Sequence, residues 1–274
     1  MTHTMGAPQL IGLPYDASSS YLRGAAEAPP LIRSALHSEA GNSWAENGLD
    51  LRTGLTDAGD LVLSHDGESR AQIESGIMAL LQNGKRPIAL GGDHSVTYPV
   101  LRAVSRFHRE LTILHFDAHP DLYEEFEGDR YSHACPFARI MEERLATRLI
   151  QAGIRCMSGP QHQQARRYNV EVIDMRAWCS GARPTVSGAL YITIDLDGID
   201  PAYAPGVSHR EPGGLSVRDV LNVIQSAGGT LVGADVVEYN PRQDLAGVTA
   251  SVAAKLVREL AGRMLAERGS MPVV

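Results

Sequence analysis

Residues 111–121 read LTILHFDAHPD, an apolar run followed directly by acidic and imidazole side chains. The apolar part, 111–114, predicts a short buried β-strand. On extended backbone the side chains repeat with a period of two, so Asp117, His119 and Asp121 can point the same way. In α/β sheets, sites are built at the carboxyl ends of strands. The stretch therefore predicts a metal site or, as the simpler alternative, a solvated acidic loop.

A second stretch of this kind follows the apolar run 188–194, where Asp195 and Asp197 again stand two residues apart. On an extended chain these two carboxylates share a face and repel each other. Burying them unpaired costs several kcal/mol unless protons or cations neutralise their charge. The second stretch therefore favours a metal site over a solvated loop.

A third strand, expected at 87–90, ends in GGDHS at 91–95. Its two glycines permit a tight turn and a close approach of backbone. His94 is then expected at a strand end, in the same layer as Asp117. A structural role is the alternative for a lone histidine. For His133, just before a predicted helix, the local sequence leaves open a helix-terminal or a catalytic role.

Strands alternate with helices along the whole chain, which predicts a mainly parallel sheet with helices on both faces. We expect strands at 8–13, 60–63, 87–90, 111–114, 148–154, 170–175, 188–194 and 230–237. We expect helices at 29–36, 71–82, 97–108, 136–145, 161–168, 217–224 and 249–266. This topology gathers the candidate site residues on one edge of the sheet: His94, Asp117, His119, Asp121, His133, Asp195, Asp197 and Glu238.

The composition limits the classes of protein that fit the chain. It has 274 residues, 43% of them hydrophobic, and a net charge of -7. With no evident linker, we expect one α/β domain over residues 1–274. No basic patch suits nucleic acid, and no apolar run approaches the roughly 18 residues of a membrane span, so we expect neither partner.

The cysteines are three in number and scattered, at Cys135, Cys156 and Cys179. They suggest neither a thiolate zinc site nor a disulfide framework, which favours a reducing compartment. The N-terminal residues MTHTMGAPQ lack a basic segment followed by an apolar one. On these grounds we expect a cytoplasmic protein.

The candidate ligands comprise four carboxylates and two imidazoles, and two divalent cations would balance the four negative charges. Oxygen and imidazole ligands without thiolate suit manganese best, with zinc, nickel, iron and cobalt as alternatives. Two such metals can lower the pKa of a shared water to near neutrality. The expected ligands are His94, Asp117, His119, Asp121, Asp195 and Asp197.

Five ordered motifs now identify a resemblance: GGDHS at 91–95, DAHPD at 117–121, SHACPFAR at 132–139, DLDGIDPAYAPGV at 195–207 and DVVEYNP at 235–241. They resemble the ureohydrolases (arginases, agmatinases and related amidinohydrolases), and the likeness covers nearly the whole chain. Two stretches, FEGDRYSHACPFARIM and GVSHREPGGLSVRDVLNVI, are most similar to plant-type arginases.

The resemblance implies a three-layer αβα sandwich with an eight-stranded parallel sheet, assembled as a homo-oligomer, a trimer or a hexamer. It implies two Mn²⁺ ions, both contacting Asp117 and Asp195. The remaining ligands would be His94 and Asp121 for one ion, and His119 and Asp197 for the other. It also gives catalytic roles to three residues: Asp121 orients the attacking hydroxide, His133 carries a proton, and Glu238 faces the guanidinium group.

The reaction implied is hydrolysis of a guanidino substrate to urea and an amine, with L-arginine giving ornithine as the first expectation. Agmatine, guanidinobutyrate and formimino substrates are alternatives. In animal arginases an asparagine in the metal motif helps to bind the amino acid head group, whereas Pro120 and Tyr123 flank the motif here. An anionic substrate would need a basic residue near the mouth, for which Arg210 is the candidate.

Two further alternatives belong to other classes. A mononuclear zinc amide hydrolase of the deacetylase type resembles this pattern but uses fewer ligands. A non-catalytic member of the family would typically have lost a ligand. All six ligands, together with His133 and Glu238, are present in this chain, which favours a binuclear enzyme over both.

Overall fold

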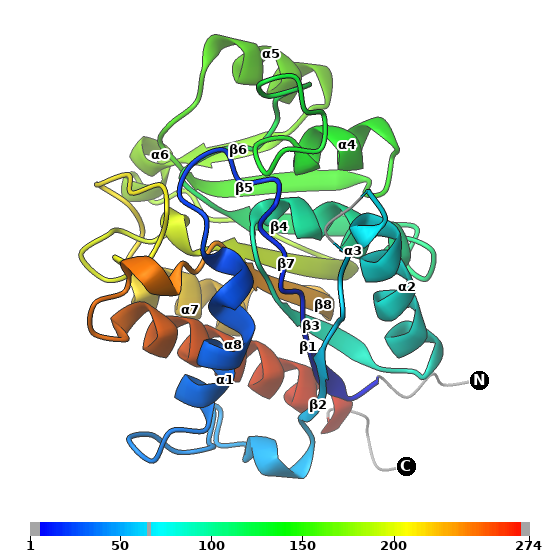
Figure 1. Cartoon of the computed structure of the whole chain (residues 1–274), viewed down its shortest axis with the longest axis vertical. Coiled ribbons are helices and arrows are strands. Elements are labelled where there is room, and N and C mark those ends of the chain that lie inside the picture. Colours follow the sequence, from blue (N-terminus) through cyan, green and yellow to red (C-terminus); the bar gives the residue numbers. More distant parts are fainter. Residues whose placement is uncertain (1–5, 65–66, 270–274) are drawn as a thin grey trace.

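The short apolar runs of the sequence become eight strands of one parallel sheet, in the order β2-β1-β3-β8-β7-β4-β5-β6 (Figure 1). The structure is a computed structural model that describes residues 6–64 and 67–269. The strands are β1 Pro8–Gly12, β2 Thr56–Asp60, β3 Arg86–Leu90, β4 Leu111–Phe116, β5 Arg148–Ile154, β6 Glu171–Asp174, β7 Ala189–Asp195 and β8 Thr230–Val237. Every strand pair is parallel, which confirms the predicted sheet.

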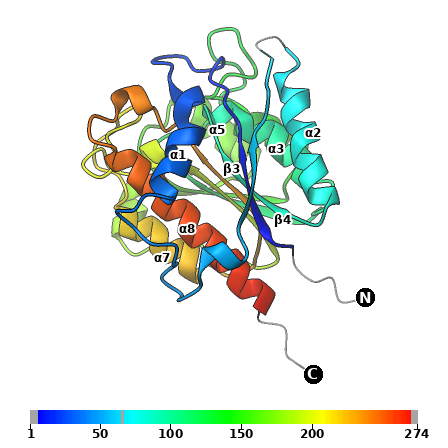
Figure 2. The ribbon, with the colours of Figure 1, turned by 60° about the horizontal axis from the view of Figure 1, so that its bottom comes forward.

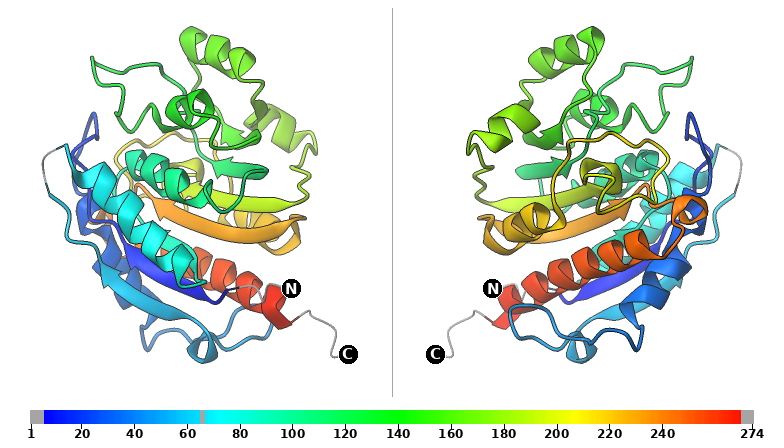
Figure 3. Two further views of the ribbon diagram at one scale, coloured as in Figure 1. Left: turned by 90° about the vertical axis from the view of Figure 1, so that its right-hand side faces the viewer. Right: turned by 90° about the vertical axis from the view of Figure 1, so that its left-hand side faces the viewer.

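Helices cover both faces of this sheet. They are α1 Ala28–Leu36, α2 Ser69–Gln82, α3 Thr97–Val104, α4 Pro136–Glu142, α5 Gly159–Arg167, α6 Met175–Cys179, α7 Val217–Ser226 and α8 Val248–Gly269. Figure 2 shows α1, α7 and α8 together on one face, with α2 and α3 on the other. The long helix α8 packs against β1, β3 and β8 (Figure 3). The predicted three-layer αβα sandwich is therefore confirmed.

The core consists of two clusters of buried apolar side chains, one on each face of the sheet. On β4, Leu114 and Phe116 belong to one cluster, and Leu111 and Ile113 belong to the other. A strand covered on both faces is apolar at nearly every position, which is why this run was recognisable in the sequence. His115, on the same strand, is polar and yet fully buried.

Helices α3 and α4 end at Val104 and Glu142, earlier than the predicted residues 108 and 145. Two further elements differ from the prediction. The strand expected at 60–63 lies at Thr56–Asp60, and all five of its residues are exposed. It is an edge strand that pairs with β1 alone, so no pattern of apolar residues marks it. Helix α6 was not expected; Asp174 begins it by accepting a hydrogen bond of 2.8 Å from the backbone N–H of Ala177.

All the described strands belong to one sheet, while the expectation of a single domain over residues 1–274 stays a prediction. Within the described ranges, no helix combines the length and the apolar character that a membrane crossing requires. The last strand, β8, lies in the middle of the sheet between β3 and β7. Together with β4, these are the strands whose carboxyl ends carry the candidate site.

Candidate metal centre

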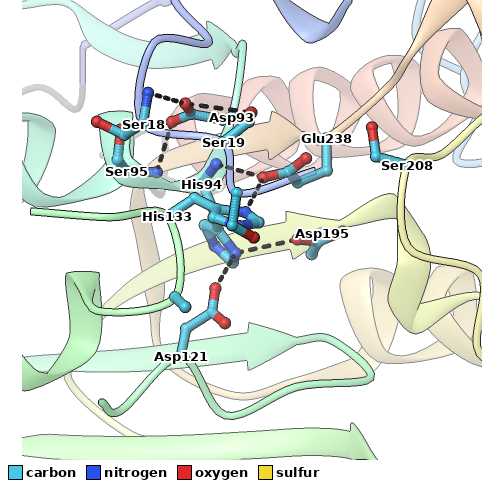
Figure 4. Close-up of polar contacts among 12 residues, drawn as sticks. Ser18, Ser19, Asp93, His94, Ser95, Asp121, His133, Asp195, Ser208 and Glu238 are labelled. Atoms are coloured by element: carbon cyan, nitrogen blue, oxygen red, sulfur yellow. Dashed lines mark hydrogen bonds and ion pairs between the residues drawn. The ribbon is translucent and has the colours of Figure 1, made fainter. Parts of the chain in front are cut away.

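Four neighbouring strands, β3, β8, β7 and β4, deliver the candidate side chains to one place. Figure 4 shows some of them together: His94, Asp121, His133, Asp195 and Glu238. His94 begins the 3₁₀ helix η3 (His94–Val96) after β3, and Glu238 follows β8. Asp195 ends β7, and Asp197 lies in the 3₁₀ helix η4 (Leu196–Gly198). The loop after β4 carries Asp117, His119 and Asp121. The sheet therefore brings together residues up to 144 positions apart in sequence.

His94 lies at the middle of a first group. Its Nδ1 atom is 3.3 Å from Oδ2 of Asp117, 3.1 Å from Oδ2 of Asp121 and 3.1 Å from Oδ2 of Asp195. All four residues are buried, and their ligand atoms lie close enough together to hold one metal ion. The structure thus brings together four of the six predicted ligands.

The ring orientation of His94 suits a cation at Nδ1. Its Nε2 atom lies 3.0 Å from the hydroxyl oxygen of Thr193. The Thr193 oxygen can accept the Nε2 proton of His94, and that tautomer leaves the lone pair on Nδ1. The Nδ1 atom is buried and, within the described part of the chain, makes no hydrogen bond of acceptable geometry. A lone pair facing three carboxylates fits a bound metal ion.

A second group adjoins the first through Asp117. The Nδ1 atom of His119 lies 3.4 Å from Oδ1 of Asp117 and 3.2 Å from Oδ2 of Asp197. Asp117, His119 and Asp197 could hold a second ion, with Asp117 shared between both groups. Asp195 falls in the first group only, so its contact with both ions stays a prediction.

Among the residues that the structure describes, no lysine or arginine forms an ion pair with the carboxylates of this site. Burial, reinforced by the charges of Asp197 and Asp117, raises the pKa of Asp195 well above its usual range. Burial and Asp117 likewise raise the pKa of Asp197 to about 7. Burial alone would lower the pKa of His94, but the carboxylates of Asp117, Asp121 and Asp195 beside Nδ1 raise it well above its usual range. These carboxylates therefore need protons or cations to remain together.

Local backbone features explain why these loops pass so close to one another. A Cβ atom on Gly92 would lie 1.7 Å from the carbonyl oxygen of Tyr15, so the GGDHS turn needs glycine there. Asp121 and Glu238 have φ angles of 49° and 62°, in the left-handed region that non-glycine residues rarely adopt. Such strained residues cluster at functional sites.

The candidate residues lie close together, but the predicted reason, the alternation of side chains along an extended strand, was wrong. Strand β4 ends at Phe116, so Asp117, His119 and Asp121 lie on a turning loop and not on one face of a strand. After β7, the carboxylate of Asp195 accepts a hydrogen bond of 2.8 Å from the backbone N–H of Asp197. This 3₁₀ turn, and not strand alternation, aims the two carboxylates.

His133 and Glu238 form a pair beside the metal ligands. Nδ1 of His133 lies 3.0 Å from Oε1 of Glu238, and that oxygen also accepts the backbone N–H of His94 at 2.8 Å. Nε2 of His133 lies 2.8 Å from the hydroxyl of Ser20. Burial lowers the pKa of His133, but the Glu238 carboxylate outweighs it and raises that pKa to about 9. His133 therefore holds a proton at neutral pH; its catalytic role stays a prediction.

A cavity of about 350 Å³ opens onto this site. Its lining residues are Ser20, His119, Tyr123, Phe126, His133, Ala134, Cys156, Met157, Ser158, Gln161, Asp195, Asp197 and His209. The sequence did not single out Ser20 or His209 as site residues. The ring of His209 lies 5.2 Å from that of His133, centroid to centroid. His209 lies in the stretch GVSHREPGGLSVRDVLNVI, which resembles plant-type arginases, and only that resemblance could have indicated it. The residues around it show no spacing typical of metal ligands.

No arginine or lysine of the described chain lines this cavity. Arg210, the candidate for an anionic substrate, donates from Nε to the carbonyl oxygen of Pro205 at 2.7 Å and is exposed. Arg155 lies nearer, but its guanidinium donates to backbone carbonyls, including that of Asp197 at 2.7 Å. Arg210 therefore does not line the cavity, and its role toward an anionic substrate stays a prediction.

Comparison with known proteins gives the family. The model of the arginase family matches residues 7–262. "Arginase, mitochondrial" of Medicago truncatula is 46% identical over 93% of this chain and 81% of its own length. The solved arginase of that organism superposes with a TM-score of 0.90 at 44% identity, over 95% of this chain and 88% of its own. "Agmatinase" of Bacillus anthracis is 32% identical over 92% of this chain and 89% of its length.

These comparisons correct the expected cytoplasmic location. The Medicago truncatula relative is named mitochondrial, and a 45% identical relative of Arabidopsis thaliana, aligned over 93% of this chain and 80% of its length, is named "Arginase 2, chloroplastic/mitochondrial". Scattered cysteines fit any compartment that keeps thiols reduced, so they never singled out the cytoplasm. The motifs, the fold and the matches agree on one point: the chain belongs to the arginase family.

Proposed function

We propose that this chain hydrolyses L-arginine to ornithine and urea at a centre that holds two Mn²⁺ ions. The observation that carries the proposal is the ring of carboxylates around Nδ1 of His94, adjoined through Asp117 to a second such group. The substrate is supported by the plant relatives, whose names are arginases.

The proposed ligands of one ion are His94, Asp117, Asp121 and Asp195. Those of the other are Asp117, His119, Asp195 and Asp197. Four carboxylates balance the charge of two divalent ions, whereas a single ion would leave a net negative charge in a buried site. When bound, the ions would supply Lewis-acid chemistry that activates water and stabilises negative charge in the transition state.

The residues of the chain supply orientation and proton transfer. Oε1 of Glu238 is held by His94 and His133, while Oε2 makes no hydrogen bond within the described residues and is free to accept one from a guanidinium. Asp121 would accept a hydrogen bond from the attacking water and orient it. His133, protonated and beside the cavity, would donate its proton to the departing amine.

Agmatine is the second candidate substrate, and the cavity lining favours it. Agmatine carries no carboxylate, and no arginine or lysine within the described chain lines the cavity to pair with one. An arginine carboxylate would have to rely on neutral donors such as Ser20, Ser158 and Gln161. Formimino substrates with an anionic end would meet the same difficulty, because Arg210 is not among the residues that line the cavity.

Urea release distinguishes these substrates. The purified protein, preincubated with Mn²⁺, is assayed in parallel with arginine, agmatine, guanidinobutyrate and guanidinopropionate. Urea mainly from arginine supports the proposal, and urea mainly from agmatine replaces the substrate while keeping the chemistry. No urea from any of them would overturn the proposed reaction.

Metal content and assembly need separate measurements. Elemental analysis of dialysed protein should give two metal ions per chain; one ion would favour a mononuclear amide hydrolase instead. We propose that the protein is a homo-oligomer, a trimer or a hexamer, as its resemblance to the family implies. Multi-angle light scattering of the purified protein tests this, and a monomer at micromolar concentration would contradict it.

A further inference from the structure

A line of three buried polar side chains runs through the sheet to the metal centre. Gln151 on β5 lies opposite His115 on β4, and its Nε2 atom is 3.0 Å from Nδ1 of His115. Nε2 of His115 is 2.8 Å from Oδ2 of Asp117. All three residues are fully buried. None of the motifs assigned above to metal binding or catalysis gives a role to Gln151 or His115.

The carbonyl oxygen of Pro120 fixes the orientation of the Gln151 amide. It lies 2.6 Å from Nε2 of Gln151 and can only accept a hydrogen bond. If the amide were turned over, two acceptor oxygens would face each other at that distance. The amide nitrogen must therefore point to Pro120, which leaves Oε1 of Gln151 without a hydrogen-bond partner within the described chain.

This orientation fixes the protonation pattern of His115. The second N–H of the Gln151 amide donates to Nδ1 of His115, so Nδ1 must carry the lone pair. The ring proton then lies on Nε2 and is donated to Asp117. The ring plane is held by Phe137, which stacks on His115 with 4.0 Å between centroids. Position, tilt and protonation of His115 are thus all determined by its neighbours.

One amide therefore supports two candidate ligands. It reaches Asp117 through His115, and it holds the Pro120 carbonyl, next to Asp121, directly. Asp121 has the strained φ angle of 49°, and such a conformation persists only where neighbouring contacts hold the backbone, here at the Pro120 carbonyl. Asp117 is the ligand common to both groups, so its orientation affects both ions.

We propose that Gln151 and His115 form a hydrogen-bond relay that positions Asp117 and the Pro120–Asp121 turn for metal binding. The inference rests on the proposed metal centre. The relay acts on metal affinity, and both residues are positioning residues, since neither reaches the cavity. Partners behind a metal ligand typically contribute about 10–100-fold in metal affinity.

The test is the dissociation constant for Mn²⁺, measured by competition with a fluorescent chelator. Gln151→Leu and His115→Phe should each raise it about 10–100-fold. Phenylalanine keeps a ring beside Phe137 but cannot donate to Asp117. His115→Gln, whose amide can donate to Asp117, should recover part of the loss.

Leu149→Ala is the matched control. Leu149 belongs to the same strand and is buried in the cluster on the same face, two residues before Gln151, and it touches no ligand. Its loss should lower the Tm and leave the Mn²⁺ affinity within about twofold of wild type, an allowance set well below the 10–100-fold effect expected of the relay. If Leu149→Ala and Gln151→Leu lower both the Tm and the Mn²⁺ affinity to the same extent, the relay is overturned, because packing alone would then explain both losses.

A second measurement does not depend on variants. Long-range ¹H–¹⁵N spectra of the wild-type protein, loaded with diamagnetic Zn²⁺, report which nitrogen of each histidine is protonated. We expect His115 neutral with its proton on Nε2; a proton on Nδ1 would contradict the relay. Wild-type protein that binds no metal would instead overturn the proposed centre, an outcome distinct from either result.

Discussion

Two groups of aspartates on the same sheet are neutralised in different ways. Asp57 and Asp60 lie on the exposed edge strand β2, and the guanidinium of Arg33 pairs with both, at 2.7 Å from Asp57. At the centre, Asp117, Asp121 and Asp195 form ion pairs, within the described chain, with histidines only. A side chain of the protein, Arg33, neutralises the first group, whereas the second group can be neutralised by cations bound from solution. The difference separates a structural acidic cluster from a metal-binding one.

The largest effect should follow from removing a central carboxylate. Asp121→Ala and Asp195→Ala should each abolish binding of at least one metal ion and lower kcat by more than about 100-fold, beyond the range seen for residues that merely support ligands. Elemental analysis and urea release measure the two effects. Full activity in either purified variant would show that this carboxylate is not needed for metal binding, and the contrast with the aspartates of β2 would no longer hold.

His133 and Glu238 are an intermediate case, because here a carboxylate has a fixed partner that can release its proton. His133→Asn should keep both metal ions and lower kcat about 100-fold or more, the usual range for a general acid. Urea release with arginine, together with elemental analysis, checks this. An unchanged kcat would remove His133 from the mechanism, and loss of metal would mean that the residue is structural.

Removal of the metal should make the thermal stability of the protein depend on the protonation of the aspartates at the candidate metal centre. In the metal-free protein the pKa of Asp197 is raised to about 7, above its usual 3.8. A raised carboxyl pKa stabilises the fold fully below pH 3.8, and this contribution is lost as pH rises through about 7. Thermal unfolding with a chelator should therefore show, from this group, a Tm that falls between about pH 4 and pH 7 and then levels off. Saturating Mn²⁺ should remove that fall, and a chelator effect independent of pH would contradict the proposal.

The smallest effect should come from the edge strand. Arg33→Met keeps the aliphatic stem and removes the ion pairs with Asp57 and Asp60. Exposed ion pairs contribute about 1 kcal/mol or less, and salt screens them. The free energy of unfolding, from urea titrations at low and high salt, should drop by no more than that, with Mn²⁺ affinity unchanged. A change in metal affinity would show that the two groups are not independent.

The difference between these regions also explains what the sequence could predict. Central strands such as β4 and β7 are covered on both faces, so uninterrupted apolar runs identified them. Strand β2 is exposed, and its place depends on backbone pairing with β1, which local sequence does not encode. It was therefore expected four residues too late. Helix α6, five residues long, gave no periodic pattern.

The same holds for the site. The proposed ligands could be named because acidic and imidazole side chains follow recognisable strands and match family motifs. Contacts between distant loops could not be named. Ser20 meets His133 across 113 residues, and Asp93 holds the backbone N–H of Ser18 at 2.9 Å across 75 residues. His209 enters the cavity on a loop whose course depends on tertiary packing.

The place of β8 in the sheet has a consequence for how the protein is made. This strand is the last in the chain, yet it separates β2, β1 and β3 from the other four strands. A chain still on the ribosome before residue 230 has two half-sheets, each with an open edge where β8 belongs. His94 then has no neighbour from β7, because β8 has not joined the halves. We expect nascent chains to acquire metal only after β8 has left the ribosome, because the two halves of the centre meet only when this strand joins the sheet.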